Sequence, residues 1–385
     1  MRLPRAIWTL GFVSLLMDVS SELVHALLPV FMVTTLHTSA LVVGLLEGLA
    51  EATPLVVMAF SGSLSDRLQN RKWVAVAGYA VSAATKPLFV IAQSTGMVAA
   101  ARLLDRVGKG IRGAPRDALI ADLTTSEQRP SAYGLRQSLD SIGAILGPLL
   151  AIALMAAWSD DVRSVFMVSA IPAALAVALL ALGVSEPNAA PKSAKPPPPR
   201  VAWRQLDAKF WSVVVVGGLF SLARFSEAFL VLRAQERGLA LTLVPLVLVT
   251  MNLVSASTAF PFGKFAERFE HRRLLASALV VLIAADVCLA VDAHWGLTLL
   301  GVALWGLQLA MTQGLMSALV ADAVPAELRA TAFGLFGAIT GAATLLASVT
   351  AGALWLVRPT LTFAVGAVVA LAALVLLPSV RRATS

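Results

Sequence analysis

One charged segment occurs twice in this chain, about two hundred residues apart. It occupies residues 62–67 and again 263–268, and a further arginine follows each copy at the same distance, Arg71 and Arg272. Each copy lies between two long apolar segments. A repeat of this size within an apolar chain predicts two similar halves that each cross a membrane several times.

The composition makes the lipid bilayer the solvent of this chain. Hydrophobic residues make up 58% and charged residues 14%, whereas soluble domains carry about 25% charged residues. A hydrocarbon core takes about 20 apolar residues for each helical span. We therefore predict an all-α membrane protein with twelve transmembrane helices in two pseudo-symmetric six-helix bundles. The predicted spans are 8–34, 41–63, 73–94, 96–121, 131–157, 162–184, 209–232, 241–262, 274–292, 296–321, 330–356 and 360–379.

The stretch between the two halves differs from the rest of the chain because it is rich in proline and contains four prolines in a row, 196–199. Such a stretch reads as a semi-rigid linker. We expect an N-terminal bundle over residues 1–185, a cytoplasmic linker over 186–208 and a C-terminal bundle over 209–385.

Lys and Arg are unevenly distributed between the predicted loops, and this bias sets orientation. With both termini in the cytoplasm, the outer segments hold only Arg163, Arg233, Arg237 and Arg358. The formal charge of +8 then reflects topology, with anionic lipid headgroups as its counterpart, and the scattered bases do not favour nucleic acid. We expect a monomer in a bacterial inner membrane.

The motifs of enzymes are missing from the sequence. It contains no phosphate-binding glycine loop, no metal-ligand spacing and no nucleophile constellation, and its single Cys288 lies in an apolar span. We expect no enzymatic activity, no metal and no cofactor, with a small-molecule substrate and a proton gradient as the energy source.

Ionisable residues within predicted spans are costly and mark functional sites by default. The first helix places Asp18, Glu22 and His25 on one face, since they are spaced by four and three residues. The fourth helix carries five charged residues at intervals of three and four, beginning with Arg102 and Asp105. The alternative is that these acids and bases pair across helices and only hold the bundle together.

The repeated segment resembles the loop between helices two and three of the major facilitator superfamily, Gly-x-x-x-Asp-Arg-x-Gly-Arg-Arg. Gln69 and Asn70 depart from that pattern. The resemblance implies a latch that closes the cytoplasmic side in one transport state, although the charges could also serve topology alone. The latch positions are Gly62, Asp66, Arg67, Arg71, Gly263, Glu267, Arg268 and Arg272.

Helix five resembles the antiporter motif of proton-coupled exporters in the same superfamily. The positions are Gly134, Gly143, Gly147 and Pro148, while Ala151 and Ile152 stand where that motif ends in two glycines. Ordinary small-residue packing is the alternative reading.

The resemblance also implies which residues line the central cavity, because helices one, four, seven and ten line it in that superfamily. These residues are Asp18, Glu22, Arg102, Asp105, Arg106, Lys109, Arg224, Glu227, Gln308 and Gln313. The leading expectation is a proton-coupled antiporter that exports a small organic compound by alternating access. A symporter importing an organic or anionic nutrient, or an exporter of a siderophore or metal ion, remains open.

Overall fold

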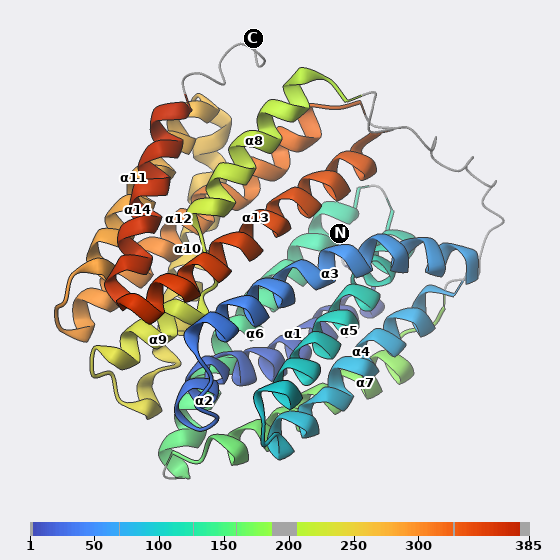
Figure 1. The fold of residues 1–385 in the computed structure, drawn as a ribbon. Helices are drawn as coiled ribbons and strands as arrows, with labels where there is room; N and C mark the ends of the chain where they lie inside the picture. The colour runs from blue at the N-terminus through green and yellow to red at the C-terminus, as the bar shows by residue number, and fades with distance from the viewer. Residues whose placement is uncertain are drawn as a thin grey trace. The chain divides into compact units, whose positions relative to one another are not determined.

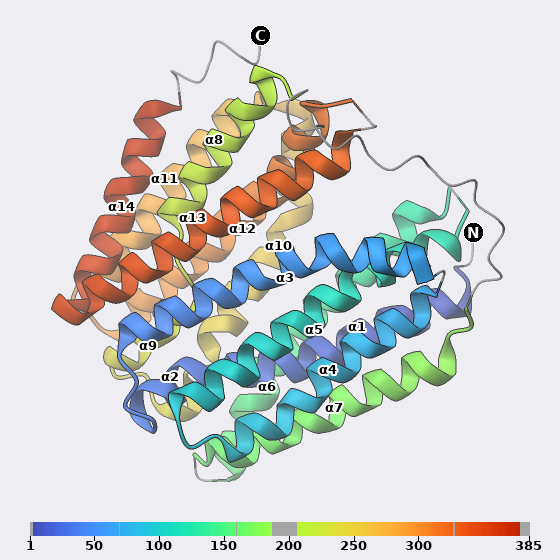
Figure 2. The same cartoon turned by 45° about the vertical axis from the view of Figure 1, so that its right-hand side comes forward.

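A computed structural model shows a helical protein (Figures 1 and 2). It describes residues 3–68, 70–125, 127–158, 160–186, 206–325 and 328–377, and no strand occurs among them. Within these ranges the side chains at 59, 63, 66, 67, 266–268, 330 and 331 are not described. Most of the predicted linker, 187–205, also lies outside the described residues.

Among the described residues, 11 helical segments are long and apolar enough to cross a membrane. The predicted span that does not meet this standard is the fourth, which corresponds to α5. This helix of 28 residues is long enough, but it is the helix that carries the rhythmic charges. The crossing by α5, and with it the arrangement of twelve spans in two bundles, therefore stays a prediction.

The contacts divide the chain into two compact units. Unit 1 comprises Met1–His37, Thr53–Lys195 and Leu241–Val249, and unit 2 comprises Thr38–Ala52, Pro196–Ala240 and Thr250–Ser385. Two helices, α3 and α10, thus contribute residues to both units. The sequence-based bundle boundaries assign each helix to a single bundle and do not include helices that belong to both units.

Helices α1 to α7 come from the first half of the chain. In unit 1, α1 packs on α6 and α7, and α4 packs on α5 and α7 (Figure 2). The first span is broken at Ala26–Leu27, where Pro29 starts a new short helix. The bounds are α1 Arg5–His25, α2 Leu28–Thr34, α3 Ala40–Leu68, α4 Arg71–Ile91, α5 Thr95–Asp122, α6 Arg129–Ala157 and α7 Val162–Gly183.

The second half repeats the plan. In unit 2, α11 packs on α12 and α14, and α8 packs on α13 and α14 (Figure 1). Its first span is also broken, between α8 and α9. The bounds are α8 Ala208–Ala223, α9 Ala228–Glu236, the short 3-10 helix η2 Leu241–Leu243, α10 Leu246–Arg268, α11 His271–Ala290, α12 Trp295–Asp322, α13 Arg329–Val357 and α14 Pro359–Leu376.

Side-chain caps explain where several helices begin. Asn70, one of the departures from the superfamily loop pattern, accepts a hydrogen bond from the backbone N–H of Trp73 at 3.2 Å and caps α4. Ser94 caps α5 in the same way through Met97. The unusual residue in the loop therefore has a structural role at the start of α4.

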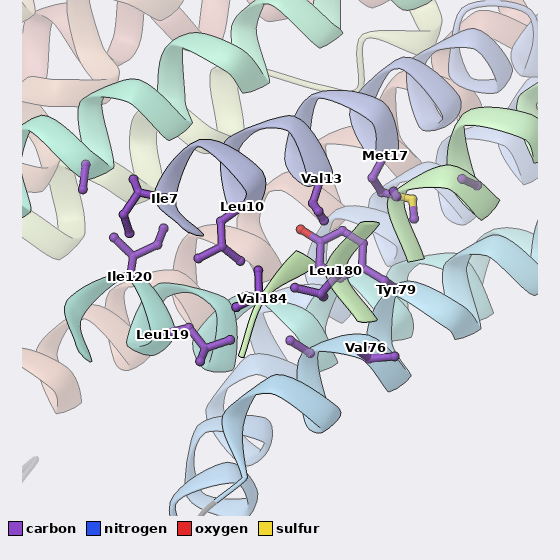
Figure 3. Packing of buried hydrophobic residues seen from close by; sticks show 14 residues of the cluster. Ile7, Leu10, Val13, Met17, Val76, Tyr79, Leu119, Ile120, Leu180 and Val184 are labelled. Atoms are coloured by element: carbon purple, nitrogen blue, oxygen red, sulfur yellow. The ribbon is translucent and has the colours of Figure 1, made fainter. Parts of the chain in front are cut away.

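The core of unit 1 lies where α1, α4, the end of α5 and α7 meet. Leu10 and Val13 of α1 pack with Tyr79 of α4 and Leu180 of α7, and all four are buried (Figure 3). These residues remove apolar surface from contact with solvent and lipid, and close packing fixes the position of α1. The charged residues of α1 lie on the same helix, so this core positions them.

Arginines bind the C-terminal ends of α4 and α11 in a similar way in the two units. Arg163 of α7 donates to the carbonyl of Val90 at 2.5 Å, and its guanidinium carbon lies 5.2 Å from the ring centre of Phe31. In unit 2 the arginine comes from α9 instead. Arg233 donates to the carbonyl of Leu289 at 2.8 Å and lies 5.8 Å from the ring centre of Phe363 on α14. Each cation satisfies carbonyls at a helix C-terminus, where positive charge is favoured.

Candidate functional site

The acidic face of α1 meets the glycines of α6. A Cβ atom added to Gly143 would lie 3.0 Å from the Cβ of Asp18, and one added to Gly147 would lie 2.8 Å from the Cβ of Glu22. These two glycines therefore permit a close approach of α6 to the part of α1 that carries the carboxylates. Gly134, the first glycine of the same motif, has no atom of a described residue within 4 Å of such a Cβ.

Glu22 and Asp18 differ in their partners. Glu22 Oε2 lies 3.4 Å from Nδ1 of His25 one turn later. Asp18 is half-buried and makes no hydrogen bond or ion pair within the described part of the chain. The charged groups that act on it most strongly are Asp140, Lys109 and Arg112. Asp18 is thus a carboxylate within a predicted membrane span that is surrounded by charged groups but has no hydrogen-bond or ion-pair partner among the described residues.

Asp105 on α5 forms ion pairs with two cations. Its Oδ1 lies 3.1 Å from Nζ of Lys86 on α4, and its Oδ2 lies 3.1 Å from the guanidinium of Arg106. Lys86 also donates to the hydroxyl of Ser21 on α1 at 3.3 Å. Lys86 and Asp105 are 1% and 2% exposed, so this buried ion pair, with the bond to Ser21, ties α1, α4 and α5 together.

The bases that follow on α5 bind side chains of α1 and α4. Arg112 donates to Ser82 at 2.5 Å and lies 4.9 Å from the ring centre of Tyr79. Arg116 donates to Ser14 of α1 at 3.3 Å. These two arginines therefore hold α5 against its neighbours, and they were not among the predicted cavity residues.

Lys109 is the exception among these bases. It is exposed although it lies in the middle of α5, and it makes no ion pair with any residue that the structure describes. Arg106, Asp18 and Arg112 are the charges that act on it most strongly. Arg102, the remaining predicted residue of α5, is buried. The six predicted cavity residues of unit 1, on α1 and α5, are linked by electrostatic influence on one another.

The predicted residues of unit 2 are less charged and are placed differently. Arg224 and Glu227 flank the break between α8 and α9, and the guanidinium carbon of Arg224 lies 5.7 Å from the ring centre of Trp305. Gln308 is fully buried and donates to Thr312 at 3.3 Å, whereas Gln313 is exposed. The two glutamines thus do not share an environment on α12.

The latch positions can be described in part. Arg71 donates to the carboxylate of Asp122 and to the carbonyl of Ala118 at 3.2 Å. The backbone N–H groups of Arg71 and Lys72 donate to the carboxylate of Glu186 at 2.8 and 2.7 Å. An acidic side chain thus caps the start of α4. The side chains of Asp66, Arg67, Glu267 and Arg268 lie outside the described residues.

The equivalent region of unit 2 is open. Arg272 and Asp322 line a cavity of about 360 Å³ together with Lys209, Glu270 and His271. A Cβ on Gly263 would meet no described atom within 4 Å, while a Cβ on Gly62 would touch Ala114 at 3.4 Å. The two copies of the repeated segment therefore have different surroundings.

Sequence reasoning left three buried polar residues out of the candidate site. Lys86 was visible as a lone base before Pro87 in an apolar span. Asp286 and Trp305 lie in unit 2, where the indole N–H of Trp305 donates to Asp286 at 3.2 Å. The signal for Asp286 was an acid within a long apolar stretch. Trp305 carried no signal, because a tryptophan in a membrane span is common.

Two acids lie just outside the membrane spans, Asp292 after the end of α11 and Asp161 before the start of α7. Asp292 accepts hydrogen bonds from Arg233 at 3.0 Å and from Arg358 at 3.2 Å. The hydrogen bond from Arg233 is the main cause that lowers the pKa of Asp292. Asp161 accepts from the hydroxyl of Ser164 at 2.5 Å, and this bond lowers the pKa of Asp161.

The family model of the Major Facilitator Superfamily matches residues 10–248 and 223–385. An uncharacterised MFS-type transporter of Methanocaldococcus jannaschii is 30% identical over 375 residues, which are 96% of this chain and 93% of that protein. Multidrug resistance protein 1 of Bacillus subtilis is 26% identical over 64% of this chain and 63% of its own length.

Solved structures share the fold at low sequence identity. A POT family transporter in complex with 5-aminolevulinic acid has a TM-score of 0.82 at 11% identity, covering 98% of this chain and 97% of that one. The nucleoside transporter NupG has a TM-score of 0.79 at 14% identity, covering 98% and 100%. With a family model that matches most of its length, this chain belongs to the major facilitator superfamily of membrane transporters.

Proposed function

We propose that this chain is a proton-coupled secondary transporter in which Asp18 carries the proton. The observation that carries the proposal is the unequal pairing of the acids in unit 1. Glu22 contacts His25, and Asp105 contacts two cations, whereas Asp18 has no hydrogen-bond or ion-pair partner among the described residues. A carboxylate without a fixed partner can gain and lose a proton without breaking the bundle.

The surroundings of Asp18 suit this role. Charges of both signs surround it, since Asp140 and Glu22 as well as Lys109 and Arg112 act on this carboxyl group. Opposing influences of this kind allow a small change in solvent access to move the proton on or off. The close contact at Gly143 places the Cβ of Asp18 directly beside the backbone of α6. In this account Glu22 and Glu227 assist, and Arg102, Arg106, Lys109 and Arg224 bind the substrate or tune the carboxylates.

The direction of transport is proposed from the sequence similarity of this chain to multidrug resistance proteins. Multidrug resistance proteins of Bacillus subtilis and Escherichia coli are 26% and 27% identical over about two thirds of this chain. This likeness and the glycines of α6 favour antiport, in which protons enter as a small organic compound leaves. Alternating access between the two halves would couple the two movements.

One observation favours a second candidate function. Lys109 is exposed in mid-span and makes no ion pair with a described residue. A substrate carboxylate or phosphate would supply the missing partner. Protonation of Asp18 would remove a negative charge that competes for Lys109, so an anion and a proton would bind together. Coupled binding of an anion and a proton is what a symporter for an organic anion requires.

We further propose the cellular setting and the latch. The chain would lie in a bacterial inner membrane as a monomer, with both termini in the cytoplasm and anionic lipid headgroups at its basic loops. The ion pair of Arg71 with Asp122 and the carboxylate of Glu186 at the start of α4 support a latch in the repeated segment. Asp66 would join this cluster in one transport state and leave it in the other.

The experiment uses inside-out vesicles with an imposed proton gradient and a pH-sensitive dye. Ethidium and tetraphenylphosphonium probe lipophilic cations, divalent metal salts probe metal export, and citrate and a sugar phosphate probe organic anions. A compound that collapses the gradient with the wild type but not with Asp18→Asn supports antiport. Asp117→Asn is the matched control, since that acid lies on α5 and pairs with Arg116 at 3.1 Å.

The same vesicles distinguish the second candidate. If the protein is a symporter, right-side-out vesicles with an imposed proton gradient should accumulate an added anion. Lys109→Gln should abolish this accumulation. Gradient collapse or accumulation that is identical in the wild type and in Asp18→Asn would remove Asp18 from the coupling mechanism.

A further inference from the structure

Unit 2 contains a buried acid that the proposed function does not use. Asp286 of α11 is 0% exposed. Its Oδ1 accepts the hydrogen bond from Trp305 of α12, and its Oδ2 has no hydrogen-bond partner in the described structure. Oδ2 points toward Gly366 of α14, where an added Cβ atom would lie 2.7 Å from it.

The surroundings of this carboxyl are aromatic. Phe225, in the break between α8 and α9, lies 5.4 Å from the ring centre of Trp305 and 5.5 Å from that of Phe363. The Cβ position of Gly366 is 3.2 Å from the ring of Phe225 as well as close to Asp286. The orphan oxygen of Asp286 therefore lies among rings that cannot neutralise a negative charge.

No helix packed against α11 brings a cation to Asp286 within the described residues. Neither α12 nor α14 contains Lys, Arg or His, and the acid of α12, Asp322, ends that helix. Arg233 of α9 is committed to Leu289, Glu236 and Asp292. Arg224 lies over the ring of Trp305. On α11 itself the ionisable groups besides Asp286 are His271, Arg272 and Arg273 in its first turn and Cys288 near its end.

We propose that Asp286 is a proton-binding site whose neutral form keeps the break between α8 and α9 packed. A buried carboxylate without a cation is far more costly than a neutral carboxyl with one unmade hydrogen bond. The neutral carboxyl accepts from Trp305 and fits the aromatic cluster. The proton is exchanged with water when the cluster opens, so no other reactant is needed.

Loss of this proton has a defined structural consequence. A carboxylate at Asp286 would draw in water or a cation, and Arg224 lies over the ring of Trp305, whose indole N–H binds Asp286. Movement of Arg224 would pull on the break, whose backbone is held by only a few bonds. Ser226 N–H donates to the hydroxyl of Ser348 at 3.1 Å, and Ala228 N–H donates to that of Ser226 at 3.3 Å. These bonds would be lost first.

The first test is infrared spectroscopy of the purified protein in liposomes. The wild type minus Asp286→Asn difference should contain a protonated-carboxyl stretching band at neutral pH. Asp105→Asn is the matched control and should remove no such band, because Asp105 is equally buried but paired with Lys86 and Arg106. Trp305→Phe should shift the band of Asp286 to higher frequency, which keeps the test valid if Asp286→Asn does not fold.

The second test is hydrogen–deuterium exchange of residues 224–228 over the pH range in which the band disappears. After correction for intrinsic exchange, exchange in the wild type should rise severalfold as the band is lost, and Asp286→Asn should show no rise. Absence of a band specific to Asp286, or loss of the band without a change at 224–228, would overturn the proposal. Both measurements are made without substrate, so they are independent of the proposed role of Asp18.

Discussion

Gly147 of α6 faces Glu22 of α1 so closely that a side chain on the glycine would begin 2.8 Å from the Cβ of the glutamate. The backbone carbonyl of Val19 is almost as near, at 2.9 Å. Two glycines of the motif, Gly143 and Gly147, therefore pack against the acidic face of α1, although the motif and the face were separate observations in the sequence.

The glycine contact gives a first prediction. Gly147→Ala should lower the melting temperature of the purified protein, since overpacking of this kind costs about 1–3 kcal/mol. Gly134→Ala is the matched control in the same helix and motif, because no atom that the structure describes lies within 4 Å of its Cβ position. Equal melting temperatures for the two variants would mean that α6 does not contact α1 at Gly147.

The buried pair of Lys86 and Asp105 gives a second prediction. Lys86→Met should destabilise the protein by about 3–5 kcal/mol, because it removes one partner of a buried charge. A double-mutant cycle with Asp105→Asn should return a coupling energy of about 1–3 kcal/mol. The exposed pair of Arg273 and Glu270, which are 3.3 Å apart, is the control. Its coupling should be about 0.5 kcal/mol or less, and a similar value for the buried pair would contradict the account.

Arg233 and Arg358 both bind Asp292, but their burial differs, and this is the basis of a third prediction. The side chain of Arg233 is 0% exposed and that of Arg358 is 65% exposed. Arg233→Met leaves carbonyls at the end of α11 without a donor and should cost about 2–5 kcal/mol. Arg358→Ala should cost about 0–1 kcal/mol. Thermal unfolding in detergent measures both, and the reverse order would show that the α11 cap does not depend on Arg233.

The lowered pKa of Asp292 gives a prediction about pH. A depressed carboxyl pKa contributes stability that is complete above the ordinary value of 3.8 and is lost as the pH falls through the value in the folded protein. The difference in melting temperature between the wild type and Asp292→Asn should therefore be constant from pH 8 to about pH 5 and shrink below pH 3.8. A difference that grows on acidification would have the wrong sign.

The sequence was sufficient for the broad architecture because membrane spans are specified by long apolar windows. It also placed Asp18 and Glu22 on one face, since helical spacing alone decides this. The same reasoning could not find the break between α8 and α9. Residues 224–227 contain neither glycine nor proline, and the break is held by a bond from Ser226 to Ser348, which is distant in sequence.

The sequence also could not show which acidic and basic side chains form ion pairs. Asp105 has Arg102, Arg106 and Lys109 as candidates one turn away or next to it on its own helix. The structure pairs it with Arg106 and with Lys86 of another helix. Which cation an acid selects depends on the packing of α4 on α5, and sequence spacing does not contain that information. The exposed position of Lys109 follows from the same packing.

The most direct test of the coupling role of Asp18 compares two transport modes in reconstituted vesicles, using a compound identified by the dye assay. Uphill transport driven by a proton gradient and exchange of labelled for unlabelled compound without a gradient are measured for the wild type and Asp18→Asn. We predict that the variant loses gradient-driven transport and retains exchange, because substrate binding and alternating access remain while the proton carrier is gone. Full gradient-driven transport by Asp18→Asn would contradict the account.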